Sequence, residues 1–163
     1  MYEQFKIQRT SRASQAREVI LLTENASGDR LTGGVASAVR EARATGAFRG
    51  KVGEVVVWTE GMLLVGIGHE DKSTVDRFRA AGAALVTKAF DLQLSAVRIH
   101  TAHVLRANDA EDAGRAFGEG LGLAAWRPGA HDGTATRREP SRRGLRIDPD
   151  DAGFREGLDD GLL

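Results

Sequence analysis

The stretch that decides the fold runs over residues 47–71, AFRGKVGEVVVWTEGMLLVGIGHED. It contains two apolar runs, 55–58 and 62–65, which only three residues separate. Two strand-forming runs so close together predict a β-hairpin, with Gly61 supplying the backbone freedom of the turn. The second run leads into Gly-Ile-Gly-His at 66–69. This exit raises a question about function, namely whether it holds a ligand or only ends a buried strand.

Outward from the hairpin, strand patterns alternate with helix patterns. The continuous apolar run at 18–23 is typical of a strand that is covered on both faces. Stretches in which apolar residues recur every three or four positions predict helices. We expect strands at 5–8, 18–23, 55–58, 62–65, 96–99 and 144–147, helices near 31–42, 75–89 and 113–124, and a loop over 127–143. This order predicts a three-layer α/β domain in which helices flank a mixed sheet.

Two of the predicted helices carry glycines that disfavour a helix by themselves. The apolar face of the second helix consists of Val75, Phe78, Gly82, Leu85 and Ala89. Glycine inside a helix costs about 1 kcal/mol relative to alanine, and we expect close packing of Gly82 against the sheet to compensate for it. The third helix has glycines at 114, 118, 120 and 122, so it too must be tightly packed.

The C-terminal residues predict the opening of a further helix. Asp148 suits the cap and Pro149 the first helical position. A single stripe would then hold Phe154, Leu158 and Leu162. Because this pattern stops in mid-helix, we divide the chain into a domain at 1–147 and, at 148–163, the start of a linking helix that belongs to a longer parent protein.

Composition excludes several classes of site. The chain has 163 residues, 41% of them hydrophobic, a formal net charge of zero and no cysteine. Disulfides, thiolate zinc sites and cysteine nucleophiles are therefore ruled out. The first residues do not resemble a signal peptide, and no apolar run approaches the roughly 20 residues of a membrane-spanning helix. These features predict a cytoplasmic protein with no membrane partner.

Two glycine pairs are candidate anion sites. The exit at 66–69 lacks the third glycine and the directly following helix of a dinucleotide-binding loop, which favours a structural turn. Gly33, Gly34 and Val35 open the first predicted helix, where free amide hydrogens attract anions. The alternative, which we favour, is that these small residues let the helix lie close to the sheet.

Histidines and arginines supply the other candidates. His100 and His103 have a spacing that suits a metal, but no carboxylate is near them in sequence, so solvent-facing loop histidines are the favoured interpretation. His69 and His131 are isolated. A basic cluster, which forms a nucleic-acid contact or merely solvated surface, comprises Arg137, Arg138, Arg142 and Arg143.

Three segments carry a resemblance to a known family. They are GAFRGKVGEVVVWTEGMLLVGIGHED, RAAGAALVTKAF and GRAFGEGLGLAAW. Their order and spacing resemble the N-terminal domain of the leucine (cytosol) aminopeptidases, in which a Phe-x-Gly-Lys-x-Gly-Glu segment precedes a strand and a later strand ends in Val-Gly-Leu-Gly. The resemblance covers roughly residues 18–126 and, faintly, 144–163.

The resemblance implies a macro-like fold and a cytoplasmic, typically hexameric parent enzyme. That enzyme would remove N-terminal residues from peptides with two divalent metal ions, Zn or Mn, bound in a separate C-terminal catalytic domain, to which residues 148–163 would lead. The family's Asn-Thr-Asp-Ala-Glu-Gly-Arg motif is absent, and the segment after Trp126 departs from the family pattern. We therefore assign no catalytic or metal-binding residue and no cofactor to this chain, and we expect it to be inactive alone.

Two rival functions stay open. ENASGDRLTGGVASAV at 24–39 is similar to the first phosphate loop of free-standing macro domains that bind ADP-ribose, although a second glycine-rich loop is missing late in the chain. The third hypothesis is a regulatory module that binds DNA through the arginine cluster.

Overall fold

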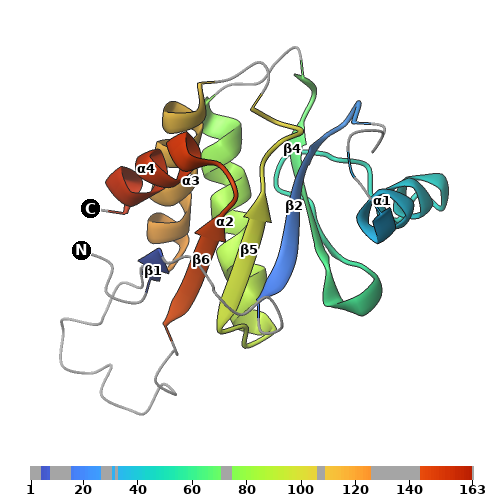
Figure 1. The fold of residues 1–163 in the computed structure, drawn as a ribbon, viewed down its shortest axis with the longest axis horizontal. Helices are drawn as coiled ribbons and strands as arrows, with labels where there is room; N and C mark the ends of the chain where they lie inside the picture. Colours follow the sequence, from blue (N-terminus) through green and yellow to red (C-terminus); the bar gives the residue numbers. More distant parts are fainter. Residues whose placement is uncertain are drawn as a thin grey trace.

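The computed structural model describes residues 5–7, 16–26, 31, 33–70, 75–105, 109–125 and 144–162. Within these ranges one six-stranded sheet is flanked by four α-helices (Figure 1). The strands are β1 (Phe5–Ile7), β2 (Arg17–Thr23), β3 (Val55–Val57), β4 (Leu63–Gly68), β5 (Ala96–His100) and β6 (Leu145–Pro149). The helices are α1 (Gly33–Ala44), α2 (Val75–Asp91), α3 (Ala110–Ala125) and α4 (Ala152–Gly161).

The sheet is mixed, as the sequence predicts. Its order is β1-β6-β5-β2-β4-β3, and every neighbouring pair is parallel except β3 and β4. The predicted hairpin is confirmed: β3 and β4 are antiparallel, with Val56 opposite Leu64. Gly61 has a φ of 77° in the connecting turn, a conformation that residues with a Cβ rarely adopt.

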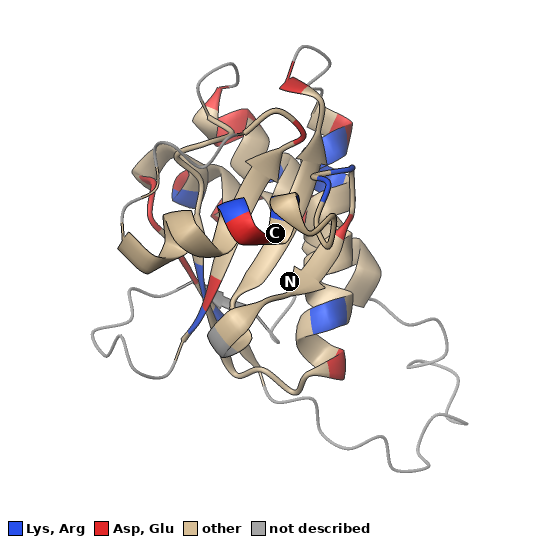
Figure 2. Cartoon of the chain, turned by 90° about the vertical axis from the view of Figure 1, so that its right-hand side faces the viewer, with Lys and Arg blue, Asp and Glu red and all other residues tan. Residues whose placement is uncertain are grey.

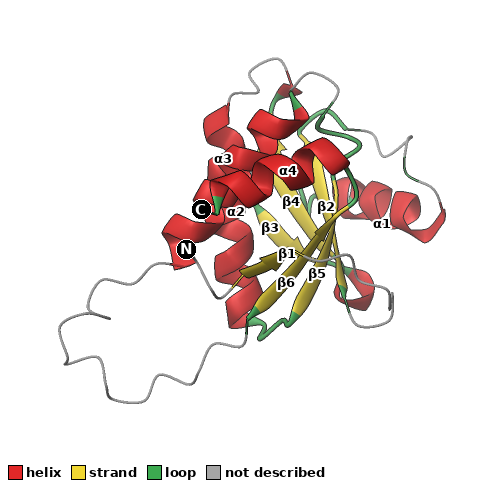
Figure 3. Cartoon of the chain, turned by 60° about the vertical axis from the view of Figure 1, so that its left-hand side comes forward, coloured by secondary structure: helices red, strands yellow, loops and turns green. Residues whose placement is uncertain are grey.

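Helices cover the two faces of the sheet unequally. Figure 3 shows α2, α3 and α4 together on one face and α1 on the other. The central strand β2 serves both sides, because Val19 and Leu21 pack in the larger core with α2–α4, while Ile20 and Leu22 pack in the smaller core with α1. All four side chains are fully buried, which confirms the predicted three-layer α/β architecture.

The first helix follows its predicted face. Val39 and Ala42 are fully buried, and Leu31 and Val35 pack against the same core. Gly46, with a φ of 72°, follows the last turn as expected. On α2 the prediction for Val75 is wrong: its side chain is 48% exposed because it lies in the first turn, beyond the region that α3 covers.

The helical glycines pack against neighbouring helices, not against the sheet as predicted for Gly82. A Cβ built on that residue would come within 3.0 Å of the carbonyl oxygen of Phe117 on α3. The arrangement is reciprocal, because Gly120 of α3 faces the carbonyl oxygen of Arg79 on α2 in the same way. Between α3 and α4, the pairs of glycine and facing carbonyl are Gly114–Phe154, Gly118–Leu158, Gly157–Glu111 and Gly161–Arg115. Backbone approach between helices therefore compensates for the poor helix propensity of these residues.

The predicted helix opening at Asp148-Pro149 is wrong, because both residues belong to β6. They pair with Arg98 and Ile99 of β5, and Asp150 donates its amide to Ile99 O at 3.0 Å. Successive N–H groups of β6 point alternately toward β5 and toward β1, so the N–H that Pro149 lacks would point toward β1. The described part of β1 ends at Ile7, opposite Ile147, so the strand tolerates the proline. Asp151 is the actual cap of α4, since its carboxylate accepts the amide of Phe154 at 2.9 Å.

Candidate functional site at the carboxyl edge of the sheet

Four parallel strands, β2, β4, β5 and β6, end at one edge of the sheet. The connections from β2 and β5, which are neighbours, lead in opposite directions, to β4 and to β6. In open α/β sheets such a reversal leaves a crevice outside the carboxyl ends of the strands, where ligands usually bind. This edge is therefore the candidate site, and its loops decide what it can hold.

The backbone of the loop over 49–54 packs against the glycine-rich exit at 66–69. Gly66 donates to Glu54 O at 2.8 Å, and Gly68 donates to Gly50 O at 2.8 Å. A Cβ on Gly66 would come within 3.0 Å of Lys51 O. The amides that a phosphate would need are already bonded, so the interpretation as a structural turn is confirmed.

The loop over 49–54 binds the carboxylate of one of its own residues, Glu54. The backbone amides of Arg49, Gly50 and Lys51 all donate to the Glu54 carboxylate at 2.8–3.2 Å. Gly50 and Gly53 have φ values of 82° and 73°. Converging amides of this kind form a site for a negatively charged group, and here the side chain of Glu54 fills it. The sequence analysis missed this role, although two glycines and a following acid are a signal for it.

A half-buried cation lies at the end of β2. The Arg43 guanidinium, from the last turn of α1, donates to Thr23 O at 2.5 Å and to Glu24 O at 2.8 Å, and it lies 5.4 Å from the centre of the Phe48 ring. Burial lowers the pKa of Arg43, and the charges of Glu54 and Glu24 partly oppose this effect. Arginine starts from so high a pKa that the side chain stays charged. This contact joins a helix to the end of a strand about 20 positions away, and no periodic pattern in the sequence predicts it.

The interpretation of His100 and His103 as solvent-facing loop residues is wrong. His100 lies on β5, half-buried, with Nε2 against a carboxylate oxygen of Glu18 and Nδ1 3.7 Å from Asp150 Oδ2. His103 is only 8% exposed. The carboxylates come from β2 and from the end of β6, which proximity in the sequence could not reveal. Within the described ranges, no group of three metal-ligating side chains occurs. His69 is half-buried, and His131 lies outside these ranges.

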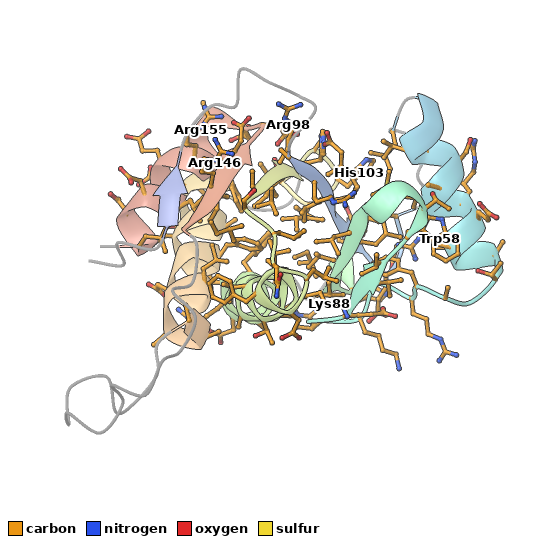
Figure 4. All side chains as sticks on the ribbon, turned by 90° about the horizontal axis from the view of Figure 1, so that it is seen from below. Trp58, Lys88, Arg98, His103, Arg146 and Arg155 are labelled. Atoms are coloured by element: carbon orange, nitrogen blue, oxygen red, sulfur yellow. The ribbon has the colours of Figure 1, made fainter. Side chains whose placement is uncertain are left out.

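Charged side chains form a ladder across three strands on the α1 side of the sheet. Glu18 of β2, Arg98 of β5 and Asp148 of β6 are linked at 3.8 and 3.5 Å, and Arg155 of α4 reaches Asp148 at 3.3 Å. Figure 4 shows Arg98 and Arg155 near the β6 side of the molecule, far from α1. Opposite charges alternate along this ladder, so it binds the strands to one another.

A shallow hollow of about 400 Å³ lies at the ends of β5 and β6, with Thr101, Ala102, Leu105, Asp150 and Asp151 around it. Its acidic groups are engaged. The Asp150 carboxylate accepts the amide of Thr101 at 3.1 Å and its hydroxyl at 2.7 Å, and Asp151 caps α4. The polar lining therefore stabilises the strand ends.

The opening of α1 is different, because none of the described residues packs against its two glycines. Gly33 has a φ of 64°, and a Cβ on Gly33 or Gly34 would meet no atom within 4 Å. The favoured idea that these glycines let α1 lie close to the sheet is therefore wrong; Gly33 is suited to its left-handed backbone instead. Val35 packs against the smaller core. Anion binding at this helix opening stays a prediction.

The basic cluster formed by Arg137, Arg138, Arg142 and Arg143 also lies outside the described ranges, as does the rest of the loop expected at 127–143. Nucleic-acid binding through it stays a prediction. On the described elements, acidic and basic residues are interspersed (Figure 2). Among these elements, no helix is both long and apolar enough to cross a membrane.

The architecture and its glycine loops can now be compared with known proteins. The model of the cytosol aminopeptidase family, N-terminal domain, matches residues 19–130, more than half of the chain. The chain belongs to the cytosol aminopeptidase family. The predicted resemblance is thereby confirmed. No curated protein matches the chain.

Solved structures show the same fold in larger proteins. The bottromycin maturation enzyme BotP is 24% identical, with a TM-score of 0.61, over 90% of this chain and 30% of that one. BotP in complex with Mn is 22% identical, with a TM-score of 0.62, over 91% of this chain and 29% of that one. A tomato leucine aminopeptidase carrying the K354E mutation is 18% identical, with a TM-score of 0.63, over 95% of this chain and 34% of that one. The chain thus spans about a third of the length of each of these proteins.

The structure also explains why the family's Phe-x-Gly-Lys-x-Gly-Glu segment has its composition in this chain. Phe48 is buried in the smaller core, a Cβ built on Gly50 would come within 3.0 Å of Thr23 O, and Glu54 binds the loop amides. The aminopeptidase signature at this place ties the ends of β2 and β4 together.

Proposed function

We propose that this chain is the non-catalytic N-terminal domain of a leucyl aminopeptidase, with a role in structure, in assembly or in controlling access to the active site. The parent enzyme would remove N-terminal residues from peptides in the cytoplasm, using two divalent metal ions, Zn or Mn, in a C-terminal catalytic domain. We further propose that the parent is a hexamer. Family membership and the span of about a third of BotP and of the tomato aminopeptidase support this assignment.

The observation that carries the proposal is the closed carboxyl edge of the sheet. The chain's own groups occupy the places where an α/β protein would hold a ligand: Glu54 among the loop amides, Arg43 at the end of β2, and Asp150 on Thr101. Each contact satisfies a group that a substrate would otherwise bind. The edge is therefore built to fix loops, as a supporting domain requires.

The link to the catalytic domain would start from α4. This helix packs on α3 through backbone contacts at Gly157 and Gly161, so its direction is fixed by the domain. We propose that residues 148–163 carry this fixed direction into the catalytic domain, with the strand continuing to Pro149 and the helix beginning at Ala152. A rigid exit would hold the two domains in a defined relative position.

Hydrolysis of a leucine amide tests the proposal. The purified chain is assayed with leucine p-nitroanilide in the presence of Mn²⁺ or Zn²⁺, beside the product of the same gene read beyond Leu163. We expect no release of nitroaniline by the chain alone and metal-dependent release by the longer product. Turnover by the chain alone, or a longer product without peptidase activity, would contradict the proposal.

One observation favours a second candidate, a macro-type domain that binds ADP-ribose. No described residue lies against the opening of α1 at Gly33 and Gly34, and a helix N-terminus attracts phosphate. Calorimetry with ADP-ribose separates the two candidates, because a supporting domain gives no binding heat. Binding that is lost in a Gly34→Glu variant, and retained in a Glu24→Gln variant, would favour the macro-type function.

A further inference from the structure

The free edge of the sheet next to α2 presents unpaired backbone groups. Gly66 donates to Glu54 O at 2.8 Å, and Trp58 donates to Met62 O at 2.7 Å. The backbone N–H and C=O groups of Glu54, Val56 and Trp58 therefore point toward β4. By alternation, the N–H and C=O groups of Val55 and Val57 point away from the sheet. Within the described ranges, neither residue makes a backbone hydrogen bond. An exposed edge of this kind is a template for an added strand.

A groove lined by residues of β3 and α2 runs beside this edge. Its volume is about 460 Å³, and its lining is Gly53, Val55, Ala83, Ala84, Thr87, Lys88, Asp91 and Ala124. Small residues on α2 leave this space open. Four exposed apolar side chains adjoin lining residues in the sequence or along β3: Val52, Val57, Leu92 and Leu123, which are 41%, 42%, 41% and 62% exposed. An open edge strand beside an apolar groove is the arrangement in which domains bind extended peptides.

Two charged side chains line the groove, the exposed Asp91 and the half-buried Lys88, and the less exposed of the two indicates what the occupant carries. Lys88 lies between the end of α2 and the β3–β4 hairpin (Figure 4) and is half-buried. Within the described ranges it makes no hydrogen bond and no ion pair, although Arg79 on the same helix pairs with Asp76 and Glu119. A half-buried ammonium without a counter-ion favours a ligand with a carboxylate.

We propose that this groove binds an extended segment of a partner protein that adds a strand to β3 and places an acidic side chain against Lys88. The backbone of the segment would bond to Val55 and Val57, and its apolar side chains would cover Ala83 and Ala84. This surface does not rest on the proposed function, because the groups that carry it, on Val55, Val57 and Lys88, lie on β3 and α2, although Gly53 of the loop over 49–54 also lines the groove.

Peptide selection tests this surface directly. Random seven-residue peptides displayed on phage are panned on the immobilised chain, and the strongest binder is synthesised and titrated by fluorescence anisotropy. We expect enriched peptides with alternating apolar residues and one Asp or Glu. Affinity should fall about tenfold in Lys88→Ala and stay within about twofold in Lys51→Ala, an exposed lysine outside the groove. Amide resonances of Val55 and Val57 should shift on binding.

A backbone control separates strand addition from simple hydrophobic binding. Val57→Pro removes an outward N–H and should abolish binding, whereas Val57→Thr keeps the N–H and the shape of the side chain and should retain it. Thermal unfolding shows whether each variant is folded. Failure to enrich any peptide, or equal binding by wild type, Lys88→Ala and Val57→Pro without shifts on β3, overturns the proposal. A dimer in light scattering that Val57→Pro abolishes would assign the edge to a second copy of the chain and likewise overturn it.

Discussion

The two sides of the sheet are held together by different kinds of contact. On one side, α2, α3 and α4 approach one another so closely that glycines face carbonyl oxygens on the neighbouring helix. On the other side, α1 covers β2 and β4 through side chains such as Val39, and charged groups occupy the strands beyond it. Backbone contact leaves no room for an added methyl group, whereas side-chain contact can adjust. The α2–α4 side should therefore be far less tolerant of substitution than the α1 side.

The largest expected effect comes from Gly157→Ala on α4. The new Cβ would come within 3.0 Å of Glu111 O, a backbone atom that cannot move without shifting α3. Overpacking of this kind costs about 3 kcal/mol, and the gain in helix propensity returns about 1 kcal/mol, so the net loss is about 2 kcal/mol. Denaturant unfolding monitored by circular dichroism measures it.

The matched control is Gly34→Ala on α1, whose Cβ would meet nothing within 4 Å. It should leave stability unchanged or raise it by about 0.5 kcal/mol. If the two alanine variants lose the same stability, the contrast between the two sides of the sheet is wrong.

These contrasts also show where sequence reasoning succeeded and where it stopped. Periodicity located the strands and helices because burial on one face repeats along the chain, as at 18–23 and on α1. Periodicity did not reveal that Gly82 faces Phe117, because it shows which face of a helix is buried but not which element packs against that face. Nor did it find the partner of His100, since Glu18 is 82 positions away.

Local turn chemistry was ambiguous for a related reason. Asp-Pro opens many helices, but pairing with β5 kept Asp148 and Pro149 in a strand and moved the cap to Asp151. The fold was thus largely predictable, whereas the groups that close the carboxyl edge, Glu54 and Arg43, became visible only once the loops were placed in space.

The second prediction concerns the loop that covers the exit of β4. Glu54→Gln keeps the size of the side chain but removes the charge that three backbone amides share. Hydrogen bonds to a charged group are stronger than those to a neutral one, so we expect a loss of about 1.5 kcal/mol. Amide hydrogen exchange should quicken at residues 49–51 first. Unchanged exchange at these amides would show that the carboxylate does not hold the loop.

The third prediction tests the cation at the end of β2. Arg43→Met keeps much of the apolar stem beside Phe48 but removes the donors to Thr23 O and Glu24 O. We expect a loss of about 1 kcal/mol in the free energy of unfolding, because water can reach the exposed part of these carbonyls. Arg43→Lys, which keeps the charge and one donor, should lose less. Equal losses in both variants would indicate that the planar guanidinium, rather than the charge, matters.

The smallest effect is expected on the charged ladder, and a double-mutant cycle is needed to resolve it. Asp148 pairs with both Arg98 and Arg155. The change in unfolding free energy caused by Asp148→Asn alone therefore combines the loss of two ion pairs with the cost of leaving both arginines without this partner. Comparing Asp148→Asn, Arg98→Met and the double variant isolates one pair, and we expect a coupling of about 0.5 kcal/mol because both side chains keep some contact with water. The coupling should shrink in high salt, since partly exposed charges are screened. A coupling above about 2 kcal/mol would mean that this face is as rigidly fixed as the glycine contacts opposite, and the two sides of the sheet would then differ in chemistry but not in tolerance.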